Sequence, residues 1–245
     1  YTVTATTGNI TDSGNLTVAG ASTFNANGAG ATITLNSSGN AFTGAVTFAG
    51  TGGLGNVTVV NSRALVLGAS TFGANFDATF TSLSQTGALA VTGTTSLTPS
   101  AANADIHLST QANNFTGAVN VGSLENVRDF KLRNTNAAPI LPDVDLMSNL
   151  RDLTLIFNSA GIALTDALTS SSVRNVVLTA SGLIDYSATG ISTMSGNLAV
   201  TSTGNGITQI GGWVVGGTTT LAAANTGDIE LLSEGNNFQG LLTIS

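Results

Sequence analysis

The stretch Gly14-Asn15-Leu16-Thr17-Val18-Ala19-Gly20 recurs further along the chain as Gly87-Ala88-Leu89-Ala90-Val91-Thr92-Gly93, a 73-residue offset, and this recurrence decides the fold. The same offset relates two further pairs of segments, Ile33-Thr34-Leu35 with Ile106-His107-Leu108 and Phe42-Thr43-Gly44-Ala45-Val46 with Phe115-Thr116-Gly117-Ala118-Val119. A third, more divergent copy starts at Trp213 and ends at Gly240. One ungapped offset across three segments indicates an internal repeat, and repeats of this kind build solenoids.

A shorter period lies between these copies. Arg128, Arg151 and Arg174 recur at a spacing of 23 residues, and the segments that they begin align with one another, namely Arg128-Asp129-Phe130-Lys131-Leu132, Arg151-Asp152-Leu153-Thr154-Leu155 and Arg174-Asn175-Val176-Val177-Leu178. This spacing predicts a structural unit of about 23–24 residues, which lies within the range of solenoid repeats. The whole chain then holds about ten units, and the 73-residue offset corresponds to about three of them.

Each unit contains short runs, such as Leu16-Thr17-Val18, in which apolar and polar residues alternate. Alternation with a period of two indicates strands with one buried face, and the Gly, Asn and Ser residues between the runs indicate turns. The prediction is an all-β parallel β-helix, or β-solenoid, that forms one segment over residues 1–245. Its core is expected to be a tube of Leu, Ile, Val, Phe and Ala, with Gly and Asn supplying left-handed backbone conformations at the corners.

Composition excludes several classes of protein. Only 8% of residues are charged, against about a quarter in a typical soluble domain, so the chain is not a coiled coil or a helical bundle. It has no Cys, which excludes a disulfide scaffold and a cysteine-ligated metal site. Six basic against thirteen acidic residues give a net charge of −7, so nucleic acid is not expected as a partner. No apolar run approaches the roughly 18 residues that a membrane span requires, so no membrane insertion is expected.

Metal and cofactor sites are not expected either. The lone His107 sits at an alternating strand position, which predicts that it faces outward. No second His or Cys accompanies it, and the sequence contains neither a G-G-x-G-x-D repeat nor an EF-hand loop. The prediction is therefore no cofactor and no metal site, and calcium binding through scattered Asp residues stays open.

A turn motif of the form N-x-F-[TQ]-G occurs once in each copy. The motif begins and ends at three pairs of residues, which are Asn40 and Gly44, Asn113 and Gly117, and Asn236 and Gly240. Together with the Gly-Asn-Leu-Thr-Val phrase at residues 14–18, it resembles the shaft repeats of filamentous-haemagglutinin-like adhesins of two-partner secretion and of autotransporter passengers.

The resemblance implies a right-handed parallel β-helix outside the bacterial cell, either secreted or on the surface. It implies a non-catalytic, structural role as the shaft of a large surface adhesin or as a unit of a surface filament, with contacts in cell adhesion or a biofilm matrix. The expected partners are a host or matrix surface, or neighbouring copies joined end to end. The chain begins and ends within strand-like patterns, so we expect it to be a segment of a longer chain.

Residues 124–185 depart from the pattern of the other copies. They hold five of the six basic residues, and Leu150, Leu153, Leu155 and Asn158 fit the leucine-rich-repeat phrase L-x-x-L-x-L-x-x-N. No helical segment accompanies this phrase, and both interpretations are parallel solenoids.

Arg128, Asp129, Arg151, Asp152 and Arg174 follow the 23-residue spacing, so we expect them to form an outward ladder of compensating charges that is also a candidate partner surface. Two alternatives stay open. Parallel β-helices also act as polysaccharide lyases and hydrolases, which use carboxylates on one outer face, and Asp129, Asp143, Asp145 and Asp152 are the candidates. The third possibility is a ligand-binding solenoid whose 124–185 face holds a partner.

Overall fold

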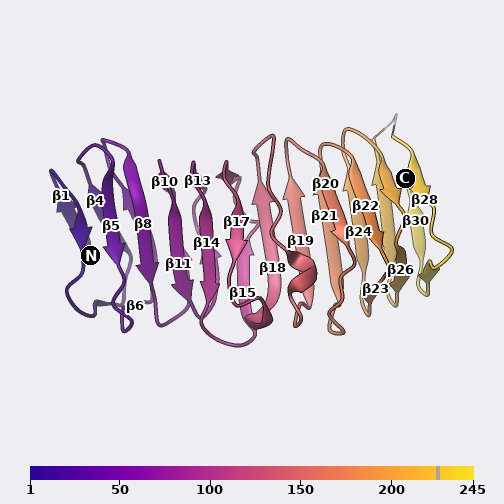
Figure 1. Cartoon of the computed structure of the whole chain (residues 1–245), viewed down its shortest axis with the longest axis horizontal. Coiled ribbons are helices and arrows are strands. Elements are labelled where there is room, and N and C mark those ends of the chain that lie inside the picture. Colours follow the sequence, from indigo (N-terminus) through magenta and orange to yellow (C-terminus); the bar gives the residue numbers. More distant parts are fainter. Residues whose placement is uncertain (225–226) are drawn as a thin grey trace.

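The computed structural model describes residues 1–224 and 227–245, and they form a β-solenoid. Short strands pair in parallel with the coils above and below, and the coils follow one another along the long axis of the molecule (Figure 1). The predicted all-β fold of stacked parallel coils is therefore confirmed.

The longest sheet, called sheet A below, has twelve strands and runs through the described residues from the first coil to the last. Its strands, in spatial and sequence order, are β1 (Thr2–Ala5), β4 (Ser22–Ala26), β7 (Ala45–Ala49), β9 (Leu65–Leu67), β12 (Leu83–Gln85), β15 (Ala104–Leu108), β18 (Val127–Asn134), β19 (Asp152–Phe157), β21 (Asn175–Ala180), β24 (Leu198–Ser202), β27 (Thr219–Ala223) and β30 (Leu242–Ile244).

The step from one coil to the next varies along sheet A. It is short where Leu65 pairs with Leu83, and longer where Ser22 pairs with Val46. The predicted 23-residue step is found from Asp129 to Asp152 and onward to Asn175. The coils that carry the three arginines therefore have the length that the sequence predicts.

Four smaller sheets complete the coils in the described part of the chain. Sheet B contains β2 (Ile10–Thr11), β5 (Ala31–Leu35), β8 (Leu54–Val60), β10 (Ser70–Phe72), β11 (Phe76–Phe80), β13 (Leu89–Val91), β14 (Thr95–Pro99), β16 (Asn114–Phe115) and β17 (Val119–Val121). Sheet C contains β3 (Thr17–Val18) and β6 (Ala41–Phe42). Sheet D contains β20 (Ile162–Asp166), β22 (Ile184–Thr189), β25 (Ile207–Gln209) and β28 (Ile229–Leu231). Sheet E contains β23 (Ile191–Met194), β26 (Gly212–Val215) and β29 (Asn237–Phe238). Two short 3-10 turns, η1 (Leu124–Asn126) and η2 (Val144–Leu146), precede β18 and β19.

The core is a stacked column of inward-facing apolar side chains. In β5, for example, Ala31, Ile33 and Leu35 are buried while the residues between them are partly exposed. Aromatic rings stack in the N-terminal half, with centroids 6.1 Å apart for Phe24 and Phe48. Each fully buried side chain of this size contributes about 1.5–3 kcal/mol, so no single one decides stability.

The interpretation of the 73-residue offset as about three units is wrong. β4 lies in sheet A, whereas the equivalent segment of the second copy is β14 in sheet B; conversely, β5 lies in sheet B and its equivalent β15 lies in sheet A. The coils between the first two copies are shorter than the predicted unit, because Val46 pairs with Leu67 and Leu67 pairs with Gln85. The offset therefore spans three and a half turns, and the second copy repeats the first on the opposite wall of the solenoid.

Sheet A continues without a break through residues 124–185, because β15, β18, β19 and β21 pair in succession. One return run in this stretch, 135–151, contains no strand and is a loop that includes η2. From Ile162 onward the opposite wall is again made of strands. The leucine-rich phrase thus belongs to ordinary coils of the same solenoid.

Candidate functional site

Three aspartates and three arginines form a ladder of ion pairs on the outer face of sheet A. Asp105, Asp129 and Asp152 lie in register on β15, β18 and β19. Each carboxylate is bound by an arginine from the next coil, so the pairs are Asp105 with Arg128, Asp129 with Arg151, and Asp152 with Arg174. In each pair the guanidinium Nε and one terminal nitrogen donate to the two carboxylate oxygens, at 2.5–3.1 Å. Such bidentate pairs fix geometry as well as charge.

The ladder carboxylates are more buried than the alternating pattern predicts. Asp129 is 3% exposed and Asp152 is 7% exposed, because the arginines of the next coil cover them. Burial acts to raise the pKa of Asp152, but hydrogen bonds from Arg174 and Asn175 outweigh it and hold the pKa below its ordinary value. The hydrogen bond to Asp129 raises the pKa of Arg151. Asp152 therefore stays ionised and paired, which does not suit a general acid.

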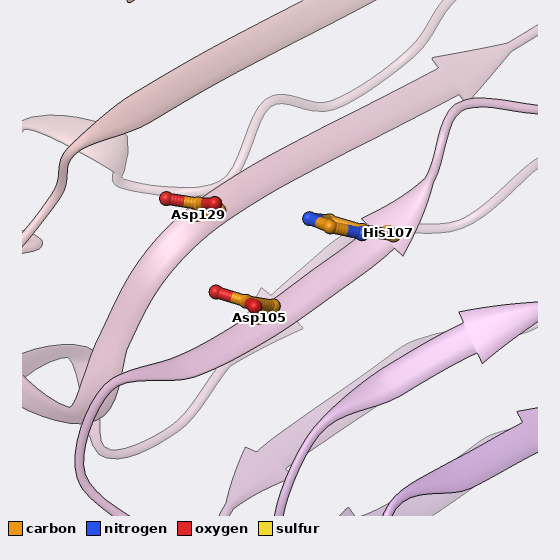
Figure 2. Close-up of side chains that lie close together, drawn as sticks. All are labelled: Asp105, His107 and Asp129. Atoms are coloured by element: carbon orange, nitrogen blue, oxygen red, sulfur yellow. The ribbon is translucent and has the colours of Figure 1, made fainter. Parts of the chain in front are cut away.

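His107 lies near two of these carboxylates, a grouping that the sequence pattern did not predict. Figure 2 shows Asp105 and His107 on one strand and Asp129 on the neighbouring strand, and one potential ligand atom from each of the three lies within 4.8 Å of the others. The His107 Nε2 is buried and has no hydrogen-bond partner among the described residues. Burial, and then the charge of Lys131, lower the pKa of His107.

This trio does not fit a metal ion. The carboxylates of Asp105 and Asp129 are already held by Arg128 and Arg151, so a bound cation would lie close to two guanidinium groups. The two carboxylates belong to the charge ladder, and His107 lies beside them.

Asp143 and Asp145 lie away from the ladder, so the four candidate catalytic carboxylates do not form one site. Asp143 immediately precedes η2 and Asp145 lies within it, and together with Asp166 of β20 they line a small hollow of about 130 Å³. Burial, followed by the charges of Asp166 and Asp143, raises the pKa of Asp145. No basic side chain lines this hollow among the described residues, so the carboxylates repel one another without a compensating cation.

The asparagine of the turn motif bonds one coil to the next. The side-chain Oδ1 atoms of Asn40, Asn113 and Asn236 accept hydrogen bonds from the backbone N–H groups of Leu16, Leu89 and Trp213, at 2.8–2.9 Å. The segments around Leu16 and Leu89 are therefore equivalent in local geometry, although they lie in different sheets.

The glycine of the motif has a different role from the one expected. Gly44, Gly117 and Gly240 do not adopt left-handed backbone conformations. A Cβ atom at these positions would collide with the backbone carbonyl groups of Gly20, Gly93 and Gly217, respectively, in the preceding coil. Glycine is required here because two backbones approach closely, and the prediction of left-handed corners is wrong for the motif residues. The left-handed conformation is found instead at other residues, namely Gly8, Gly30, Gly53, Asn103, Ser123 and Gly190.

Two further asparagines make the same kind of bond and were not predicted. Asn61 accepts from the backbone N–H of Phe42 at 2.8 Å and donates to its carbonyl at 3.0 Å. Asn134 does the same with Phe115, at 3.0 Å for both bonds. The 73-residue offset relates Asn61 to Asn134, so the repeat carried the signal that could have identified them.

One family model matches this chain, described as Repeats of unknown function (DUF5649), over residues 1–49, 54–122 and 158–245. The unmatched residues 123–157 include Arg128, Asp129, Arg151 and Asp152 of the ladder. No curated protein and no solved structure matches the chain. No helix in the described part of the chain has the length and apolar character needed to cross a membrane.

Proposed function

The chain belongs to the DUF5649 family of repeats of unknown function, and from that premise we propose that it is a non-catalytic shaft segment of a large bacterial surface adhesin or filament. The observation that carries this proposal is sheet A, whose twelve strands connect the coils of the described chain in one continuous ladder. Hydrogen bonds between coils run along the long axis, so a load on the shaft is shared by all the bonds between two coils.

The use of the polar side chains supports a structural role over catalysis. The buried amides of Asn40, Asn61, Asn113 and Asn134 bond backbone groups of adjacent coils. The buried carboxylates of the ladder are paired with arginines, and the charged side chains that line the hollow at Asp145 are all acidic among the described residues.

A location outside the cell is supported by composition. The chain has 8% charged residues, is rich in Thr and Asn, and has no Cys, and its turn motif resembles that of exported adhesin shafts. The proposed partners are a host or matrix surface, or copies of the same chain joined end to end, in cell adhesion or biofilm contacts.

Immunogold labelling of the native cells tests the location, with the isolated solenoid as antigen. Label outside the outer cell boundary is the expected result, and label confined to the cell interior would contradict the proposal. A depolymerisation screen on acidic and neutral polysaccharides tests the catalytic alternative. We expect no cleavage; cleavage that is lost in Asp143→Asn or Asp145→Asn would instead establish an enzyme.

A further inference from the structure

A groove of about 480 Å³ crosses the outer face of sheet A beside the charge ladder. Its floor is a single column of residues in register on successive strands, namely Lys131, Thr154, Val177, Ala199 and Thr220. One long cationic side chain therefore stands at one end of the groove, and shorter side chains line the rest. The groove runs along the solenoid axis, a shape that suits an extended polymer.

One wall of the groove is held in place by hydrogen bonds between coils. The Asn175 side chain donates to Asp152 at 3.0 Å and accepts from the backbone N–H of Asn197 at 3.0 Å. Asn197 in turn accepts from the backbone N–H of Thr218 at 2.9 Å. This chain of bonds fixes the wall before any ligand arrives, which lowers the entropy lost on binding.

The charge around the groove differs from that of the rest of the chain. Five of the six basic residues lie on this face, and the three carboxylates among them are each bound by an arginine. The Lys131 side chain makes no ion pair or hydrogen bond with another described residue, and the Arg133 side chain bonds only the neutral side chain of Asn158 among them, at 2.7 Å. The remainder of the chain has ten acidic residues and one basic residue. Lys131 and Arg133, which have no carboxylate partner, therefore form a small positively charged patch on an acidic protein.

The groove also offers polar groups that the protein does not use. The hydroxyl groups of Thr154 and Thr220 make no hydrogen bond to another described residue, and both line the groove. No aromatic side chain of the described residues lines it, so they offer no stacking surface to a sugar ring there. A neutral glycan would thus rely on weak hydroxyl contacts, and an anionic group is needed to gain binding from Lys131.

We propose that this groove binds an acidic polysaccharide, with a carboxylate or sulfate group on Lys131 and sugar hydroxyls on Thr154 and Thr220. The proposal deepens the shaft function by naming the matrix partner, and rests on that function. A nucleic acid is a poorer fit, because one lysine lines the groove among the described residues and the chain carries a net charge of −7.

Affinity electrophoresis of the whole 245-residue chain in gels with polygalacturonate, dextran sulfate or neutral dextran tests this proposal. We expect retardation by an acidic polymer and none by dextran, with affinity that falls as salt rises. Retardation by polygalacturonate assigns the carboxylate, and retardation by dextran sulfate assigns the sulfate. Lys131→Gln should weaken binding about tenfold. Arg63→Gln, which removes the basic residue outside this face, is the matched control and should bind like the wild type.

A second variant tests the groove without removing the charge. Ala199→Phe fills the floor and should abolish retardation, whereas Ala222→Phe, which lies on β27 outside the groove, should not. Thermal unfolding checks that both variants fold.

Three results of the electrophoresis would overturn the proposal. The first is no retardation by any acidic polymer, and the second is equal binding by wild type, Lys131→Gln and Ala199→Phe. The third is that both substitutions abolish binding to single-stranded DNA but leave binding to the acidic polysaccharides unchanged. Salt-sensitive self-association that Lys131→Gln abolishes would also overturn it, because the occupant would then be a second copy. None of these outcomes alters the location measured by immunogold labelling, so failure of the groove and failure of the shaft function are distinguishable.

Discussion

The side-chain amides of Gln85 and Asn113 face one another across adjacent coils and exchange two hydrogen bonds, Nε2 to Oδ1 at 2.8 Å and Nδ2 to Oε1 at 3.0 Å. Both side chains are buried, and the Asn113 Oδ1 also accepts from the backbone N–H of Leu89. A buried amide that is fully hydrogen-bonded specifies how its neighbours align, whereas an unpaired one is costly.

The third copy has the same pair, and the first copy has a related one. Gln209 and Asn236 exchange equivalent bonds at 2.7 and 3.1 Å. In the first copy Asp12 takes the place of the glutamine and accepts from the Asn40 side chain at 2.7 Å. Because the second copy is displaced by half a turn, this polar pair stabilises opposite walls of the solenoid in successive copies.

Replacement of Asn113 by Leu should lower the free energy of unfolding by about 2–4 kcal/mol, because the Leu89 N–H and the Gln85 amide lose their partners in the core. Urea unfolding followed by circular dichroism measures the change. Asn114→Ala is the matched control, since Asn114 is exposed, and it should stay within about 0.5 kcal/mol of wild type. Equal stability of Asn113→Leu and wild type would show that the amide pair is dispensable.

Gly117→Ala should destabilise the protein by about 1–3 kcal/mol, because the new Cβ meets the carbonyl group of Gly93 and forces the coils apart. Gly14→Ala is the control: a Cβ there meets nothing within 4 Å, and its φ is not left-handed. That variant should be neutral or slightly stabilising. Differential scanning calorimetry compares the two, and similar melting temperatures would contradict the close-approach explanation.

The stacking of the ladder could be predicted from the sequence, whereas the position of the repeats around the axis could not. Arg128, Arg151 and Arg174 stack because the 23-residue step is constant there. The half-turn displacement depends on the shorter coils between Val46 and Gln85, and their length is set by turn geometry that apolar alternation does not report.

Burial of the ladder carboxylates could not be predicted from the alternation of apolar and polar residues either. Asp129 alternates outward, but the side chain that covers it, Arg151, comes from the next coil. The groove beside Lys131 escaped prediction for the same reason, because its floor consists of residues from five successive strands whose sequences contain no common motif.

Asp152 should make stability depend on pH in the acid range. Its pKa in the folded protein lies below the ordinary value of 3.8, so the unfolded chain takes up its proton first as the pH falls. The stabilisation is complete above the ordinary pKa and is lost as the pH falls through the lower folded value. Arg174→Gln removes the hydrogen bonds to this carboxylate, so its loss of stability relative to wild type should be large at pH 7 and shrink below pH 3.8. Urea midpoints measured across this range give the comparison, and a difference that does not vary with pH would exclude the linkage.

Asp145 should affect the pH dependence of stability in the direction opposite to that of Asp152. Its pKa is raised by burial and by Asp166 and Asp143, so the ionised carboxylate destabilises the folded state at neutral pH. The unfolded carboxyl has the ordinary value of 3.8, and folding regains stability as the pH falls through the raised folded pKa toward that value. Asp145→Asn should therefore raise the melting temperature at pH 7, and the gain should disappear below pH 3.8. Glu234→Gln, at an exposed position, is the control for the loss of one negative charge; an equal gain in that variant would assign the effect to net charge.

The pair of Asp129 and Arg151 should be strongly coupled. Arg151→Gln leaves the buried Asp129 carboxylate without its bidentate partner, and should lower the free energy of unfolding. We expect this loss of stability to be smaller than that for a fully buried ion pair, because the Arg151 side chain is 33% exposed. Asp129→Asn in the same chain removes the unpaired charge, so the double variant should be more stable than Arg151→Gln alone. A double-mutant cycle by urea unfolding measures the coupling. Additive losses would show that the two groups do not stabilise the coils as a pair. The control is Arg133→Gln, because the Arg133 side chain bonds the neutral Asn158 and has no carboxylate partner.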